Sequence, residues 1–212
     1  MKKIKNFKEV ENHVKCFLNL FFKEVMKMNL NLGCGSKIYD DYVNVDKFDL
    51  YDIDIQHDLE KFPYPFDDNS VEEIILSHVL EHIGQDPAIF IKIVKEFYRI
   101  CKNQALINIS VPHPRHDDFI SDPTHVRPIT VTGLSLFDKA HNEEWERIGA
   151  ANTPLGLIHN LNFKIESVSY KIEDDIMSKF KEGQIDQQRF DFMIKHYNNI
   201  IKQIDIKWRV IK

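Results

Sequence analysis

The chain has 212 residues, of which 43% are hydrophobic and 29% are charged. This length suits one α/β domain with a substantial core and is short for two, and the composition is that of a folded globular protein. The formal net charge of −5 and the pI of about 6.1 argue against a protein that binds duplex nucleic acid through a basic face.

The charges are distributed unevenly along the chain. Residues 40–87 hold fourteen Asp or Glu residues against two Lys residues, and such a stretch would repel a phosphate backbone. Residues 1–28 carry seven Lys against three Glu residues and form the one sizeable basic stretch. We interpret this stretch as the solvated face of a helix.

The cysteines and the apolar runs bear on location. Cys16, Cys34 and Cys101 are odd in number and have no metal-binding spacing. We therefore expect no disulfide framework and a reducing, cytoplasmic setting. No apolar run is long enough to cross a bilayer, and the N-terminal residues lack the uninterrupted apolar core of a secretory signal.

The first expected element is an amphipathic helix over 7–27, because its apolar residues recur at steps of three and four. Short runs rich in Val, Ile and Leu then predict strands that alternate with helices or short links. These strands are 28–32, 42–46, 53–57, 71–76 and 105–111, with a helix over 86–101 before the last of them. A polar segment rich in Pro and His follows over 112–130.

The second half predicts more helix and two further strands. Helices are expected near 132–140 and 153–161, a strand at 163–172, a helical segment over 176–203 and a last strand at 204–211. The alternation of strands and helices predicts an α/β fold with a mostly parallel sheet covered on both faces. The whole chain, 1–212, is expected to form one domain.

Polar residues follow the ends of the first four strands. In an open α/β sheet, ligands bind beyond these carboxyl ends, where the strand order reverses. Gly33 and Gly35 let the backbone turn tightly after the first strand. Asp46, after the second strand, can accept hydrogen bonds from both hydroxyls of a ribose. Asp58 can accept one from an adenine amino group, and Leu59 can pack on the ring.

Taken together, these segments resemble successive motifs of class I S-adenosylmethionine-dependent methyltransferases, in particular of a type 11-like subgroup. The resemblance runs from about Asn29 to Thr130, and more loosely through the terminal strand. The segments that carry it are Asn29–Gly35, Tyr42–Asp46, His57–Leu59, Pro63–Ser70, Ser77–Ile83 and Asp122–His125.

The resemblance implies a Rossmann-like sheet of seven strands with helices on both faces and an antiparallel last strand. From this resemblance together with the periodicity of the chain, we expect the domain to consist of an N-terminal helix (1–27), a cofactor-binding core with the acceptor wall (28–175), a helical insertion (176–203) and a terminal strand (204–212). The cofactor is expected to be S-adenosyl-L-methionine. The expected cofactor-binding residues are Asn31, Gly33, Cys34, Gly35, Asp46, Lys47, Asp58, Leu59, Ser77 and His78.

Two departures from the family's pattern affect the methionine end of the cofactor. Asn31 stands where the family often has an acid, and an amide lacks the charge that would pair with an ammonium group. The third glycine of the full motif is absent, with Lys37 or Ile38 nearby. These departures leave the adenosine half of the motif unchanged.

The expected reaction is in-line transfer of the methyl group to a small-molecule or sugar acceptor. Positioning can account for much of such a rate, and a general base helps if the acceptor is a hydroxyl. Histidines crowd the segment after the fifth strand, so His113 and His116 are the candidate bases. The candidate acceptor-binding residues are His82, Arg115, His125 and Arg127.

Several alternatives stay open at this point. A metal site among His113, His116, Asp117, Asp122 and His125 is a minority interpretation, because the spacings fit no established motif, and we expect no metal. A nucleic-acid methyltransferase would need a basic groove. Against a catalytically silent cofactor-binding module stand the intact Gly33, Gly35, Asp46 and Asp58. A nicotinamide-dependent oxidoreductase predicts a fuller glycine motif. We expect no membrane association, and the insertion permits either a lid or a homodimer surface.

Overall fold

The computed structural model describes residues 28–212, so the helix expected over 7–27 lies outside the described residues. The strands are β1 (Met28–Leu32), β2 (Val43–Asp46), β3 (Ile55–Gln56), β4 (Val71–Ser77), β5 (Cys101–Pro112), β6 (Phe163–Ile172) and β7 (Ile201–Val210). The helices are the 3₁₀ turn η1 (Leu80–His82), α2 (Pro87–Ile100), α3 (Asp117–Ile120), α4 (Val131–Ser135), α5 (Lys139–Ile148), α6 (Leu155–His159), α7 (Asp174–Lys181) and α8 (Gln187–His196).

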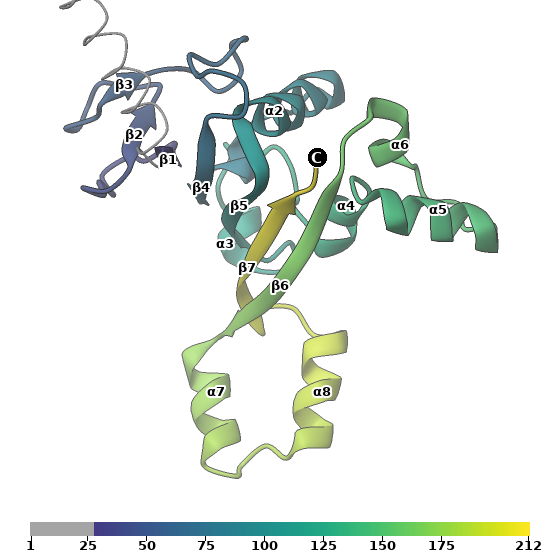
Figure 1. The fold of residues 1–212 in the computed structure, drawn as a ribbon. Helices are drawn as coiled ribbons and strands as arrows, with labels where there is room; N and C mark the ends of the chain where they lie inside the picture. The colour runs from purple at the N-terminus through teal and green to yellow at the C-terminus, as the bar shows by residue number, and fades with distance from the viewer. Residues whose placement is uncertain (1–27) are drawn as a thin grey trace, which may run out of the picture.

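One seven-stranded sheet organises the molecule, in the order β3-β2-β1-β4-β5-β7-β6 (Figure 1). The strands β1 to β5 pair in parallel, and β7 runs antiparallel to both β5 and β6. This confirms the predicted seven-stranded, mostly parallel sheet with an antiparallel last strand. The strand order reverses between β1 and β4, which is where a doubly wound sheet opens a crevice for a ligand.

Within residues 28–212, every helix follows β4 in the chain. Residues 33–70, which join β1 to β4 through β2 and β3, contain no helix. Since crossovers between parallel strands are right-handed, the connections before and after the reversal pass over opposite faces of the sheet. One face is therefore covered by α2 and by the helices between β5 and β6, and within residues 28–212 the connections over the other face are loops.

The sequence of α2 determines both where this helix begins and which of its faces is buried. Asp86 accepts a hydrogen bond from the Ala88 backbone N–H, and Pro87 occupies the first turn, so the helix begins with a good cap. One face of α2 is apolar and enters the core. That face consists of Phe90, Ile93, Val94, Phe97 and Ile100.

An aromatic cluster closes the core between the last two strands and the helices after β5. Phe163 on β6 stacks on Trp208 of β7 with ring centroids 4.0 Å apart. Phe137 meets both rings edge-on. Phe137 lies in the break between α4 and α5, where a single helix over 132–140 was expected. That expectation was wrong because Asp138 caps a new helix by accepting from the N–H groups of Ala140 and His141.

A pair of helices, α7 and α8, projects from the end of the β6–β7 ribbon away from the sheet (Figure 1). We call residues 174–196 the lobe. Gly183, with φ of +74°, and the cap Asp186 separate the two helices, so the predicted helical segment 176–203 is broken. It is also too long, because β7 begins at Ile201 and not at 204.

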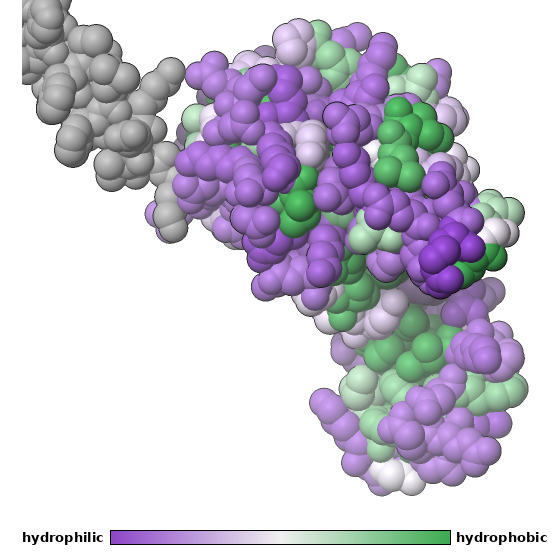
Figure 2. Space-filling model, turned by 45° about the vertical axis from the view of Figure 1, so that its right-hand side comes forward, coloured by the Kyte–Doolittle hydropathy of each residue, from purple (hydrophilic) through white to green (hydrophobic). Residues whose placement is uncertain are grey.

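The lobe shares a small apolar core with the adjoining ends of β6 and β7. This core is made by Ile172, Phe190, Met193, Ile200 and Ile201. Figure 2 shows apolar side chains gathered where the lobe joins the body of the molecule. Within residues 28–212, no helix has the length and apolar character needed to cross a membrane.

Candidate functional site

The loop after β1 is fixed by its two glycines and by Asp46. Gly33 has φ of +65°, and a Cβ on it would lie 2.7 Å from a methyl carbon of Val79. Gly35 has φ of +50° and donates its N–H to Asp46 Oδ2 at 2.9 Å. Only glycine combines this conformation with such a close approach, so the spacing seen in the sequence has a direct steric cause.

A cavity of about 460 Å³ opens beyond the carboxyl ends of β1 to β4, and we call it the large cavity. It is lined by Gly33, Asp46, Lys47, Phe48, His57, Asp58, Leu59, Glu60, His78, Val79, His82, Ile83 and Thr124. The residues that follow four separate strands therefore share one crevice, at the reversal of strand order.

The wall formed by residues 57–60 is held rigidly from behind. The Tyr64 hydroxyl donates to the Leu59 carbonyl at 2.7 Å, and burial raises the pKa of this hydroxyl so that it stays a donor. Glu60 Oε1 accepts from the Gly84 backbone N–H at 2.7 Å. Asp58 Oδ1 accepts from the N–H of Glu60 at 3.0 Å. The apolar face of Leu59 thus lies beside a fixed carboxylate.

The large cavity carries three carboxylates, from Asp46, Asp58 and Glu60. Asp46 uses one oxygen on Gly35 and the other on the Phe48 N–H at 3.0 Å, and each carboxylate oxygen can accept more than one hydrogen bond. An acidic, partly apolar crevice of this kind suits a ligand that carries hydroxyl or amino donors and positive charge.

A second cavity of about 230 Å³, the small cavity, lies next to the first and shares His78 with it. Its walls are His78, Pro112, Asp118, His125, Lys202 and Gln203. His78 adopts φ of +57°, a left-handed conformation that is uncommon for a non-glycine residue and concentrates at functional sites. The nearby Glu81 carboxylate raises the pKa of His78.

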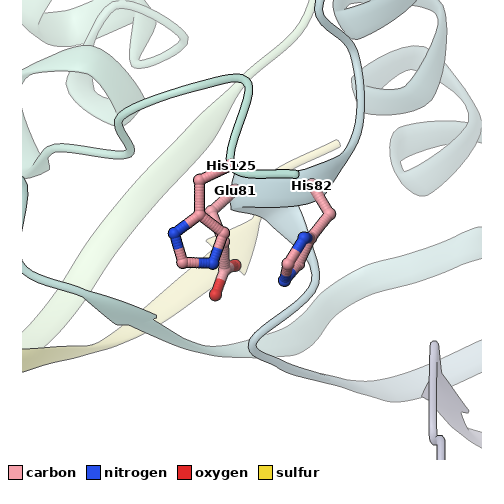
Figure 3. Close-up of side chains that lie close together, drawn as sticks. All are labelled: Glu81, His82 and His125. Carbon is pink, nitrogen blue, oxygen red and sulfur yellow. The ribbon is translucent and has the colours of Figure 1, made fainter. Parts of the chain in front are cut away.

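Figure 3 shows the side chains of Glu81, His82 and His125 lying close together. Glu81 and His82 come from η1, and His125 comes from the loop that follows α3. Backbone hydrogen bonds from Val126 and Arg127 to the Glu81 carbonyl, at 2.8 and 3.2 Å, hold the two segments together. His82 lines the large cavity and His125 lines the small one.

Six of the predicted cofactor-binding residues line the large cavity. They are Gly33, Asp46, Lys47, Asp58, Leu59 and His78. Gly35 supports the cavity through its hydrogen bond to Asp46.

The other three are not among the described residues that line the large cavity. Asn31 is 2% exposed and donates to the Lys37 carbonyl and to Asn44 Oδ1, so it shapes the loop from behind. Cys34 is buried, and burial together with Asp46 raises the pKa of its thiol to about 11. Ser77 accepts a hydrogen bond from Lys37 Nζ.

The two predicted bases lie outside both cavity linings. His116 is 6% exposed; its Nε2 lies 2.8 Å from Glu173 Oε1, and its Nδ1 accepts from the Asp118 N–H. His113 accepts from the Arg115 N–H, and burial lowers the pKa of its imidazole. These contacts hold β5, α3 and the lobe in place and give no support to a role in proton transfer.

The two predicted acceptor-binding arginines are also engaged in structural contacts. Arg115 donates to the carbonyls of Ile194 and Lys195 at the end of α8. Arg127 donates to the Gly84 carbonyl and stacks on the Phe90 ring at a separate cavity of about 240 Å³. Of the four residues predicted to bind the acceptor, His82 and His125 are the two that come together.

Sequence reasoning missed Glu81, Thr124 and Gln203. Glu81 stood inside a motif already singled out, but a glutamate in a short turn is usually exposed, and nothing local indicated that it is fully buried. Gln203 reaches the site from β7, which neighbours β5 in the sheet and is distant in sequence. Thr124 lies within Asp122–His125, so the resemblance could have indicated it.

The fold is similar to that of a solved S-adenosylmethionine-dependent methyltransferase, and further solved structures resemble it more loosely. One such protein from Archaeoglobus fulgidus matches over 93% of this chain and 93% of its own, with 16% identity and a TM-score of 0.57. One from Methanosarcina mazei matches over 91% and 97%, with 12% identity and a TM-score of 0.49. A protein from Sulfolobus solfataricus described as a type 11 methyltransferase matches over 93% and 92%, with 13% identity and a TM-score of 0.45.

The sequence matches no family model and no curated protein. The similarity to the Archaeoglobus protein is one of fold, and it shows that this chain has the fold of the S-adenosylmethionine-dependent methyltransferases.

Proposed function

We propose that the chain is a methyltransferase that binds S-adenosyl-L-methionine in the large cavity. The single observation that carries this proposal is the shared crevice that joins the Gly33–Gly35 turn, Asp46 and Asp58. In it, Asp46 would accept from the ribose hydroxyls, and Asp58 from the adenine amino group beside Leu59. The three carboxylates suit the positive charge of a sulfonium.

The cofactor supplies a methyl group bound to a sulfonium, and the carbon of this methyl group is already strongly electrophilic. The chain's task is therefore to hold an acceptor in line with the bond that breaks and to exclude water. The small cavity is the candidate acceptor site, since it adjoins the large one through His78. His78 faces both cavities, so it is the side chain best placed to contact the acceptor.

We infer that the acceptor is a small molecule or a sugar. The small cavity, of about 230 Å³, suits a small group, and the acidic stretch 40–87 lines much of the large one. Repulsion of phosphates by this stretch disfavours a nucleic acid. The free, buried thiols of Cys34 and Cys101 fit a reducing, cytoplasmic setting.

Cofactor binding is tested by titration calorimetry with S-adenosyl-L-homocysteine, the demethylated product, and with NAD. We expect binding of the first and none of the second. Asp46→Ala should weaken binding at least tenfold, because about 1.5–3 kcal/mol is lost with each hydrogen bond to a charged group. Asp49→Ala, an exposed acid three residues away, is the matched control and should bind normally. Equal affinity of the two variants would place the cofactor elsewhere.

The acceptor class is tested by transfer of labelled methyl groups to cell extracts divided into small-molecule, glycan and nucleic-acid fractions. We expect label in the first or second fraction. Label confined to the nucleic-acid fraction would contradict the proposed acceptor while leaving the cofactor assignment intact.

A further inference from the structure

Three side chains that offer metal-ligating atoms lie close together where the two cavities adjoin, His82 lining one cavity and His125 the other. Glu81, His82 and His125 each offer one ligand atom, and these atoms all lie within 4.8 Å of one another (Figure 3). We propose that these three residues bind one divalent transition-metal ion, with Zn²⁺ or Fe²⁺ the best chemical fit. Two imidazoles and one carboxylate are the donor set that such ions prefer over Mg²⁺ or Ca²⁺.

Hydrogen bonds fix the tautomer of each imidazole in the form that binds a metal. The Thr124 hydroxyl donates its hydrogen to Asp122 Oδ1 at 2.6 Å. His82 Nδ1 lies 2.9 Å from the same hydroxyl oxygen and must therefore be its donor. His125 Nδ1 lies 2.8 Å from the Phe119 carbonyl, which can only accept. In the neutral rings, with Nδ1 protonated, each Nε2 carries the lone pair, as in histidines that ligate metals.

The third side chain, Glu81, is a buried carboxylate without a satisfactory partner. The residue is 0% exposed, and within residues 28–212 neither of its carboxylate oxygens accepts a well-aligned hydrogen bond. The nearest side-chain nitrogen that could carry a positive charge is His78 Nδ1, 3.3 Å from Glu81 Oε1, and this ring is charged only when protonated. A buried carboxylate whose oxygens accept no well-aligned hydrogen bond is costly, and a bound cation removes that cost.

The geometry needs only a small contraction to hold an ion. Ligand atoms at about 2.0–2.1 Å from one Zn²⁺ lie about 3.4 Å apart in a tetrahedron. Rotations of the partly exposed His82 and His125 side chains can close the remaining gap. Three protein ligands also leave an open coordination position, which is the pattern of catalytic rather than structural sites.

The position of this site suggests what the ion does, and this step rests on the proposed methyltransferase function. His82 lines the large cavity and His125 the small one, so an ion held by both would lie where donor and acceptor would meet. An acceptor hydroxyl held at the ion loses its proton to water more readily, and its oxygen forms the O–CH₃ bond as the S–CH₃ bond breaks and leaves a thioether.

The test uses tag-free, full-length protein that has been treated with a chelator and dialysed. Zn²⁺ binding is measured by calorimetry, and Co²⁺ binding by the visible absorption of the bound ion, with Mg²⁺ as a comparison. We expect one Zn²⁺ per chain and no comparable binding of Mg²⁺. His125→Ala should abolish this binding. Thr124→Val, which keeps the side-chain shape and removes the partner of His82, should weaken it about 10- to 100-fold.

His141→Ala is the matched control, because His141 is an exposed histidine on α5, outside both cavity linings, and it should bind Zn²⁺ like the unaltered chain. Unchanged affinity in both His125→Ala and Thr124→Val would overturn the site, as would absence of Zn²⁺ binding by the unaltered chain. S-adenosyl-L-homocysteine is titrated into the same samples. Normal binding of it in His125→Ala shows that the variant is folded.

The two proposals can fail separately in this experiment. If Zn²⁺ binding follows the variants as expected but S-adenosyl-L-homocysteine does not bind, the metal site stands and the cofactor assignment fails. If S-adenosyl-L-homocysteine binds and Zn²⁺ does not, the metal site fails and the cofactor assignment stands.

Discussion

At the scale of single residues, Gly33 connects two parts of the site. Its Cα lies against the side chain of Val79, which follows β4 and precedes the turn that carries Glu81 and His82. Its N–H donates to the Val45 carbonyl at 2.7 Å, so the same residue also binds the end of β2. The fit of this one residue therefore sets the spacing between three strand ends.

Gly33→Ala should destabilise the chain by about 2 kcal/mol or more, because a left-handed conformation and a forced contact with Val79 both oppose the added methyl group. The free energy of unfolding in urea measures the effect. Gly183→Ala is the control: it has φ of +74° with nothing within 4 Å, so only the conformational cost of about 1 kcal/mol applies. Equal losses in the two variants would show that the contact with Val79 is unimportant.

At the scale of elements, α2 holds the loop that precedes β4. Arg99 donates to the carbonyls of Phe66 and Tyr64 and to the carboxylates of Asp68 and Glu96. Glu96 in turn accepts from the Tyr64 backbone N–H. Burial opposes the ionisation of Glu96, but these hydrogen bonds outweigh it and lower its pKa below the ordinary 4.5.

Glu96→Gln should cost about 1–3 kcal/mol at pH 7, because Arg99 and Tyr64 lose a charged acceptor. A carboxyl group with a lowered folded-state pKa contributes stability above its unfolded pKa, and this contribution disappears as the pH falls through the folded value. The difference between the two proteins should therefore be constant at neutral pH and shrink below about pH 4.5. Unfolding in urea at several pH values measures it, and a difference that persists in acid would contradict the assignment.

Arg115 joins the segment after β5 to the end of α8, where helix carbonyls lack partners within the helix. Arg115→Ala should let α8 fray and raise amide hydrogen exchange in residues 187–196, with a stability loss of about 1 kcal/mol. Binding of S-adenosyl-L-homocysteine should not change. Arg147→Ala, which removes an exposed ion pair on α5, should leave exchange in α8 unaltered. Loss of S-adenosyl-L-homocysteine binding in Arg115→Ala would instead show that Arg115 contributes to ligand binding.

An element could be predicted from the sequence when the residues that determine its bounds are close to it in the chain. The strands β1, β2 and β4 could be predicted because their apolar runs and following turns are local. The break at Gly183 and the extension of β7 to Ile201 could not, since Ile201 joins the sheet through pairing with Ile172 on β6. Local helix periodicity continued across both points.

At the scale of the whole molecule, two separate apolar cores coexist. The larger contains the sheet and α2, and the smaller holds the lobe through Phe190 and Met193. Phe180 and Phe190 stack with centroids 4.4 Å apart, so one contact joins α7 to α8.

Phe190→Ala should therefore unfold the lobe without unfolding the sheet. Removing a largely buried phenylalanine costs about 3 kcal/mol, more than a small core of a few side chains can lose. Amide hydrogen exchange should rise throughout residues 174–196 while β4 and β5 stay protected. Phe97→Ala, in the larger core, should instead raise exchange across the whole sheet. Parallel behaviour of both variants would show a single cooperative unit.

The candidate site likewise contains residues whose position follows from nearby sequence and residues whose contacts come from distant elements. Asp46 and Asp58 could be predicted to share a crevice, because parallel strands end at one edge of the sheet. The engagement of His116 with Glu173, and of Arg115 with α8, depends on elements some 60 to 80 residues further on. The burial of Glu81 depends in the same way on the loop that carries His125.

The two edges of the sheet bear on how copies of this chain meet in solution. An exposed edge strand offers unpaired backbone groups to which another chain can add. Here β3 has only two residues, and the ten-residue β6 carries Lys164, Glu166 and Lys171 and shifts register against β7 at two places. Short length, charge and bulges each prevent a continuous ladder. Growth of the sheet from molecule to molecule, the usual route to fibrous aggregates, is thus opposed at both ends.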